Sequence, residues 1–225
     1  SAGINTNTLL TLEPWNQQII GLGGTIYTGI STAGIQTYQR PLGGKHGMVY
    51  AVSGAGATAE NQDRRGLYLT TVGTMLVDHL TAVHAQWEEG AEYRTEFESD
   101  TASAVEKILT GMIILSGFET GGERLQAALD AADQEEEHSC FSDNTHVDMI
   151  QDIQGVHNVW NGTYGDISGT SLASIVAEVD ADLATRVGDK IDESLALAND
   201  LPVPFDNAIA EDNADGRAKV EALVV

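Results

Sequence analysis

Apolar side chains recur at intervals of three and four residues through most of this chain from Asp63 onward. Such spacing places them along one face of an α-helix. The longest apolar stripe runs from Leu172 to Ala198, and shorter ones occupy 68–87, 105–129 and 147–160. We therefore predict an all-α chain in which residues 61–225 form four or five antiparallel helices packed as a helical bundle.

Local signals predict where these helices begin, bend and end. Ser142 to Thr145 are good N-cap residues for the helix over 147–160, and Gly162 suits its left-handed cap. Asp180-Ala181-Asp182 is a candidate break in the longest stripe, and Pro202 and Pro204 should stop it, because proline cannot continue the hydrogen-bond ladder. Gly117, Gly121 and Gly122 are expected to loosen or bend the second helix. Residues 91–100 are expected to be an acidic, aromatic connection.

The first 60 residues form a glycine-rich N-terminal segment with much Thr, Ser and Asn. Glycine costs about 1 kcal/mol per helical position relative to alanine. Residues 1–60 are therefore predicted to be largely irregular, and residues 61–225 to be the helical domain.

A short acidic segment over residues 133–146 carries the densest chemistry in the chain. It contains five carboxylates, two histidines and the only cysteine, Cys140. Oxygen and imidazole ligands at close spacing are what a cation site needs. The alternative is an acidic joint whose residues cap one helix and open the next, because acidic surface segments are common.

The charge balance narrows the classes of partner. With 34 acidic and 11 basic residues the formal net charge is −23, so nucleic acid and anionic lipid should both repel the chain. Cations and basic proteins are favoured, although the same charge would also serve solubility. A single cysteine excludes an intramolecular disulfide and a Cys-based zinc cage and leaves the redox state of Cys140 open. No run approaches the roughly 18 apolar residues of a membrane span.

The acidic segment also resembles a known family. Its residues, with supporting strings before and after it, look like the signature of the imelysin family, in particular its iron-regulated protein A branch. The matching strings are Glu137-His138-Ser139-Cys140-Phe141-Ser142-Asp143-Asn144-Thr145-His146, Gly155-Val156-His157-Asn158-Val159-Trp160-Asn161-Gly162-Thr163-Tyr164, Asp63-Arg64-Arg65 and Pro204-Phe205-Asp206-Asn207-Ala208-Ile209. The resemblance covers roughly residues 25–220, the C-terminal two-thirds of such a protein. Residues 1–60 would then be a remnant of the region between its two bundles.

Membership would imply an all-α fold of two helical bundles, export to the periplasm, outer membrane or extracellular space, and an association with iron acquisition. The family's founding member is classed as a metallopeptidase. Its second hallmark, Gly-x-His-x-x-Glu, corresponds here to Gly29–Gly34, where Ser31 replaces the histidine and Gly34 the glutamate. Neither can ligate a metal as imidazole and carboxylate do or activate water, so hydrolysis by that site is not expected. The resemblance leaves the second half of the site, with Glu137, His138, Asp143 and His146 as candidate metal ligands.

Three functions remain open from the sequence. The first is an exported, non-catalytic imelysin-like protein that binds a protein partner or a cation such as iron, zinc or calcium. The second is a structural or assembly subunit that oligomerises through helix faces or associates with a missing N-terminal portion, since the chain opens at Ser1 without a methionine and is expected to be processed or trimmed. The third, a metallopeptidase with a rearranged site, is the least favoured because the histidine spacing selects no tetrahedral trio.

Overall fold

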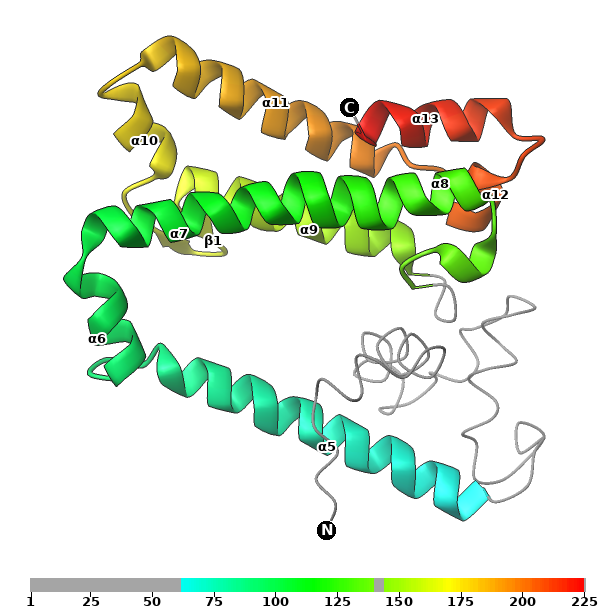
Figure 1. The fold of residues 1–225 in the computed structure, drawn as a ribbon, viewed down its shortest axis with the longest axis horizontal. Helices are drawn as coiled ribbons and strands as arrows, with labels where there is room; N and C mark the ends of the chain where they lie inside the picture. The colour runs from blue at the N-terminus through cyan, green and yellow to red at the C-terminus, as the bar shows by residue number, and fades with distance from the viewer. Residues whose placement is uncertain (1–61, 140–143, 225) are drawn as a thin grey trace. The chain divides into compact units, whose positions relative to one another are not determined.

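A computed structural model describes residues 62–139 and 144–224 (Figure 1). The chain divides into two compact units, Ser1–Ile108 with Ser139–Asp143, and Leu109–His138 with Asn144–Val225. The predicted domain boundary at residue 60 and the glycine-rich segment before it lie outside the described residues. The all-α prediction is confirmed, since helices dominate and the described strands form a single two-stranded ribbon.

The first unit contains helices α5 (Gln62–Gln86) and α6 (Glu92–Ser99), which pack on each other. Helix α5 follows the predicted apolar stripe. Its apolar side chains are nonetheless open to solvent among the described residues, with Leu80 and Val83 each 58% exposed. The apolar periodicity thus predicted the helix correctly, but it does not identify what packs against the apolar face of α5.

The acidic, aromatic connection between the first two long helices is itself helical, because residues 92–99 form α6. Its first turn carries Glu92, which the helix dipole favours, and Arg94 Nε lies 2.7 Å from Glu98 Oε1 one turn later. Trp87 packs edge-on against Tyr93 and Phe97, with ring centroids 5.0 and 5.1 Å away. These aromatic contacts give a polar segment the tertiary support that its own sequence lacks.

One continuous helix covers Thr101–Ala131. It begins as α7 (Thr101–Ile113), continues as the π-helical segment η1 (Ile114–Gln126) and ends as α8 (Ala127–Ala131). The glycines at 117, 121 and 122 lie in η1, where the backbone N–H of Ala127 donates to the carbonyl of Gly122, five residues earlier. The predicted loosening therefore takes the form of a wider helical turn, and the chain leaves α8 through Ala132 at φ 50°.

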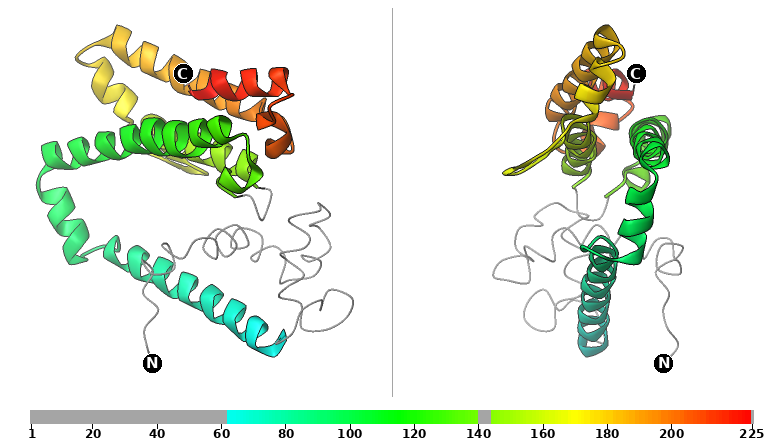
Figure 2. Two further views of the ribbon diagram at one scale, coloured as in Figure 1. Left: turned by 45° about the vertical axis from the view of Figure 1, so that its right-hand side comes forward. Right: turned by 90° about the vertical axis from the view of Figure 1, so that its left-hand side faces the viewer.

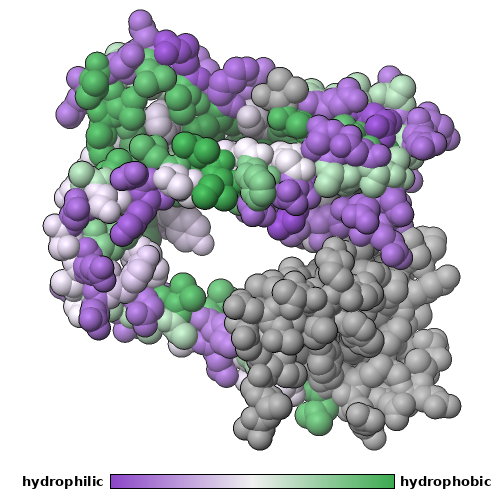
Figure 3. Space-filling model, in the orientation of Figure 1, coloured by the Kyte–Doolittle hydropathy of each residue, from purple (hydrophilic) through white to green (hydrophobic). Residues whose placement is uncertain are grey.

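This helix is also long and apolar enough, by length and composition, to cross a membrane, and it is the one such helix in the described residues. Only 6% of its most apolar 18-residue window is buried within the structure, and a single such helix is weak evidence for a span, which the sequence analysis did not predict. Its C-terminal half packs against α9 and α13. Ile113, Ile114 and Phe118 remain exposed, and apolar surface gathers over α7 and the start of η1 (Figure 3).

The second unit is an antiparallel helical bundle, as predicted, but the prediction also places α5, which belongs to the first unit, in this bundle. Helices η1, α9 (Thr145–Asn161), α11 (Ala181–Asn199) and α13 (Ala214–Val224) alternate in direction (Figure 1) and lie side by side in both views of Figure 2. Helix α9 packs on η1 and α11, and α13 packs on η1 and α11. The short helices η2 (Gln134–Glu136), α10 (Leu172–Ala177) and α12 (Phe205–Ile209) connect them.

Several predicted ends are confirmed. Asp180 divides the longest stripe and accepts a hydrogen bond from the backbone N–H of Leu183 at the start of α11. Gly162 ends α9 at φ 62°. After it, strands β1 (Thr163–Tyr164) and β2 (Ile167–Ser168) pair antiparallel, which the sequence analysis did not predict.

The core of this unit lies where α8, the start of α9, α12 and α13 meet. Phe205, Ile209, Met149 and Val220 are fully buried there, together with Leu125, Ala128, Leu129, Leu201 and Ala208. Burial of this cluster fixes the two ends of the acidic segment, because α8 precedes it and α9 follows it.

Candidate functional site

The acidic segment joins α8 to α9 through the short helix η2. Asp133 caps η2 by accepting a hydrogen bond from the backbone N–H of Glu135 at 3.0 Å. Glu137 is fully buried, and Ser139 and Thr145, which follow it in the sequence, are buried as well. A buried carboxylate is costly unless hydrogen bonds or a cation compensate it. The sequence between two packed helices has thus placed an acidic group in the interior.

His138 lies against the first turns of α9. Its Nε2 is 3.9 Å from Asp148 Oδ2, and each of the two side chains is about one-quarter exposed, at 29% and 24%. Asn144, the residue before α9, donates a hydrogen bond to Asp148 Oδ1 at 2.7 Å. Asp148 is therefore held from one side by Asn144 and faces the imidazole on the other.

One turn further along α9, Asp152 faces η1. It accepts a hydrogen bond from the hydroxyl of Thr120 at 3.0 Å. On the same segment, Arg124 forms an ion pair with Glu119 at 3.1 Å. The result is a partly buried polar cluster that joins η1, α9 and His138 and that we call the His138 cluster: Glu119, Thr120, Arg124, His138, Asn144, Asp148 and Asp152.

Burial decides the protonation of this cluster. Desolvation lowers the pKa of His138 below its usual 6.5, and Arg124 lowers it further, while Asp148, Asp152 and Glu119 partly offset this. Desolvation likewise raises the pKa of Asp152 above 3.8; Asp148 adds to the rise, and Thr120, His138 and Arg124 oppose it. Near neutral pH His138 is a neutral imidazole, which is the form that binds metal ions.

The lowered pKa of His138 predicts a pH-dependent stability. As the pH falls below 6.5, the unfolded histidine gains a proton that the folded one resists, so the free energy of unfolding should fall until the folded pKa is passed. Asp152 acts in the opposite sense, because its raised pKa weakens the fold as the pH rises through and above 3.8. Urea unfolding from pH 4 to 7 should show a loss towards acid that the His138→Gln variant reduces. An identical pH profile for the two proteins would contradict the assignment.

The predicted ligands are only partly described. Glu137 is buried and His138 is part-buried at the end of the same short loop, and His146 Nδ1 is buried without a hydrogen-bond partner. Asp143 lies outside the described residues, as do Cys140, Ser31 and Gly34. Among residues 62–139 and 144–224, no three His, Cys, Asp or Glu side chains are grouped to hold a metal ion. The described ligands alone thus do not make up a metal site.

The sequence analysis missed the residues that surround His138. Asp148 and Asp152 follow Asn144 at intervals of four, a spacing that places all three on one face of α9. That spacing was available as a signal. The hydrogen bond between Thr120 and Asp152 joins residues that are 32 positions apart in the sequence. It therefore depends on the packing of α9 against η1, which the sequence does not show.

A protein-family model matches most of the chain. The family model described as Imelysin matches residues 44–225. No curated protein shows significant similarity to the chain. The match covers the acidic segment and every described helix from α5 to α13.

Proposed function

This chain belongs to the imelysin family, and from that premise we propose that it is an exported, non-catalytic member that binds a cation at the joint between α8 and α9. The family is associated with iron, which makes iron acquisition the natural setting and the periplasm or outer membrane the natural place. In this proposal Glu137, His138, Asp143 and His146 supply the ligands.

The observation that supports a cation is the burial of Glu137 next to a neutral imidazole. Glu137 is fully buried, and desolvation keeps the pKa of His138 low. Asp148 and Asp152 add negative charge within the same part of the bundle. Carboxylate oxygens with one or two imidazoles suit iron or zinc, and oxygens alone suit calcium. Arg124 opposes a cation, which favours weak binding.

The absence of catalysis rests on the sequence. Ser31 and Gly34 occupy the positions at which the family motif has histidine and glutamate. Metal-assisted hydrolysis needs a ligand set with an open position and a group that activates water. Without those two side chains the remaining residues could hold an ion but would lack half of the hydrolytic apparatus.

Thermal unfolding of the full chain with Fe(III), Zn(II) or Ca(II) tests the cation proposal. An ion that binds only the folded state raises Tm. The substitutions His138→Ala and Asp143→Asn should each remove this increase in Tm. His84→Ala is the matched control, because His84 is 78% exposed on α5 and pairs with Glu88. If no ion shifts Tm, or if the shift survives both substitutions, the proposal is wrong.

A second candidate is an assembly subunit, favoured by exposed apolar side chains on the long helices. Leu80 and Val83 on α5 and Ile113 and Phe118 on α7 and η1 are between 58% and 69% exposed. Exposed apolar surface on each of these helices is of the kind that often marks an interface. Light scattering separates the two candidates, because a monomer in solution contradicts self-assembly while leaving cation binding in place.

A further inference from the structure

A cavity of about 680 Å³ lies within the helical bundle, between η1, α9, α11 and α13. Its size falls in the range of about 300–1,000 Å³ usual for small-molecule sites. All of its lining residues belong to the unit Leu109–His138 with Asn144–Val225. The cavity is thus a property of one packed unit.

The walls of this cavity are chiefly apolar. Leu125 from η1 and Ile153 and Val156 from α9 are buried at its inner side. Helix α11 contributes Leu183, Val187 and Ile191, and α13 contributes Leu223. Helices α9 and α11 approach closely beside it, since a Cβ at Gly188 would lie 3.4 Å from the indole nitrogen of Trp160. A hydrocarbon chain would find matching walls on three sides.

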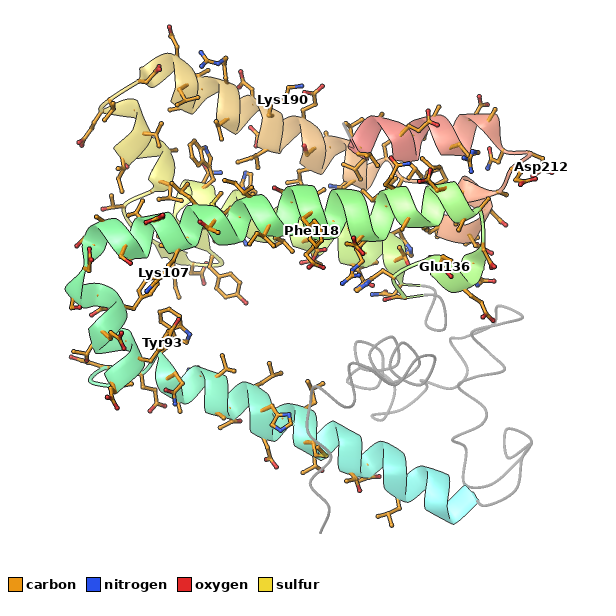
Figure 4. All side chains as sticks on the ribbon, viewed as in Figure 1. Tyr93, Lys107, Phe118, Glu136, Lys190 and Asp212 are labelled. Atoms are coloured by element: carbon orange, nitrogen blue, oxygen red, sulfur yellow. The ribbon has the colours of Figure 1, made fainter. Side chains whose placement is uncertain are left out.

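The charged residues at this cavity depart from the rest of the chain. The whole sequence has 34 acidic and 11 basic residues, whereas Arg186 and Lys190 outnumber the single acidic lining residue, Asp189. Lys190, labelled on α11 in Figure 4, pairs with Glu193 at 2.6 Å. Arg186, one turn earlier, makes no ion pair, hydrogen bond or ring contact with any residue among 62–139 and 144–224.

Arg186 differs in this respect from every other described Lys or Arg side chain. Arg94, Arg124 and Lys219 pair with carboxylates, Arg217 donates to a carbonyl, and Lys107 lies over the ring of Phe97. In a chain so rich in carboxylates, an unpaired guanidinium at the wall of an apolar cavity is an available anion-binding group.

We propose that this cavity binds a small anionic amphiphile, an aliphatic carboxylate of fatty-acid type. The guanidinium of Arg186 takes the carboxylate at the mouth, because arginine and carboxylate form strong, paired hydrogen bonds. The aliphatic chain lies against Leu125, Ile153 and Val187, where burial of apolar surface stabilises it. This site is separate from the cation proposal and requires none of the four predicted metal ligands.

Calorimetric titration of the full chain with dodecanoate, below its micelle concentration, tests this proposal. Dodecanoate should bind, and both 1-dodecanol and dodecyltrimethylammonium should bind more weakly, since neither offers an anion. Arg186→Gln should weaken dodecanoate binding by at least about tenfold, the loss expected for a hydrogen bond to a charged group. Lys219→Gln is the matched control, because Lys219 pairs with Asp200 and does not line the cavity.

A second variant tests the cavity itself. Val187→Phe adds volume at the wall and should reduce binding of dodecanoate, with circular dichroism used to confirm the fold. If Val187→Phe fails to fold, Arg186→Gln still tests the proposal, because Arg186 is exposed and its substitution should leave the fold intact. The proposal would be overturned if dodecanoate did not bind, or if 1-dodecanol and dodecyltrimethylammonium bound as tightly as dodecanoate. An affinity for dodecanoate that Arg186→Gln left unchanged would also overturn it.

Discussion

Replacing Phe205 with alanine is expected to lower the free energy of unfolding of the helical bundle by about 3–5 kcal/mol. Phe205 is fully buried and lies in the cluster with Met149, Ile209 and Val220. The truncation removes the transfer free energy of the ring and leaves a cavity that close-packed neighbours fill only partly. Urea unfolding followed by circular dichroism measures the change.

Val203→Ala is the matched control for this prediction. Val203 lies two residues before Phe205 and is 64% exposed, so its truncation should change the free energy of unfolding by less than about 0.5 kcal/mol. A loss of similar size in both variants would show that the C-terminal helices do not pack as the structure describes.

The Phe205 cluster also bears on the candidate cation site. Met149 belongs to the cluster and directly follows Asp148, the carboxylate that faces His138. Leu129 belongs to it as well and precedes the acidic segment by four residues. The cluster therefore holds both ends of the joint, and loosening it should weaken cation binding.

Helical periodicity and capping predicted most of the bundle because both are local properties of the sequence. Asp180 begins α11, Gly162 ends α9, and the prolines after Leu201 prevent α11 from continuing, each through its own backbone or side-chain chemistry. Helix α6 was missed because its support comes from Trp87, which lies outside the segment. The π-helical form of η1 was likewise not predicted. Glycines indicate only where a helix can deform, and the packing around them decides the form that the deformation takes.

The candidate site, too, was predicted only where it depends on local sequence. A dense local string identified Glu137 and His138, but the groups that set the protonation of His138 come from α9 and η1. The sequence cannot show which of its many carboxylates meet across two helices. For the same reason it gave no hint of Arg186, which lines the cavity and forms no ion pair, hydrogen bond or ring contact within the part of the chain that the structure describes.

Substituting Gly216 with alanine is expected to cost about 1–3 kcal/mol, the usual effect of overpacking. Gly216 is buried at the start of α13, and a Cβ there would lie 2.7 Å from the carbonyl oxygen of Ala208 and 2.8 Å from its Cα. These are backbone atoms of α12 and cannot rotate away. Urea unfolding measures the loss.

Gly111→Ala is the matched control, because it adds the same methyl group in α7 with no atom within 4 Å. It should stabilise the helix by about 0.5–1 kcal/mol, the usual advantage of alanine over glycine inside a helix. Equal losses in both variants would contradict the tight contact between α12 and α13.

The Gly216 substitution also connects the core to the proposed amphiphile site. Helix α13 carries both Gly216 and Leu223, and Leu223 lines the cavity opposite α9. Pushing the start of α13 away from α12 should tilt that wall, so Gly216→Ala should weaken dodecanoate binding while leaving Arg186 untouched. Unchanged dodecanoate affinity in a measurably destabilised Gly216→Ala variant would mean that α13 does not shape the cavity.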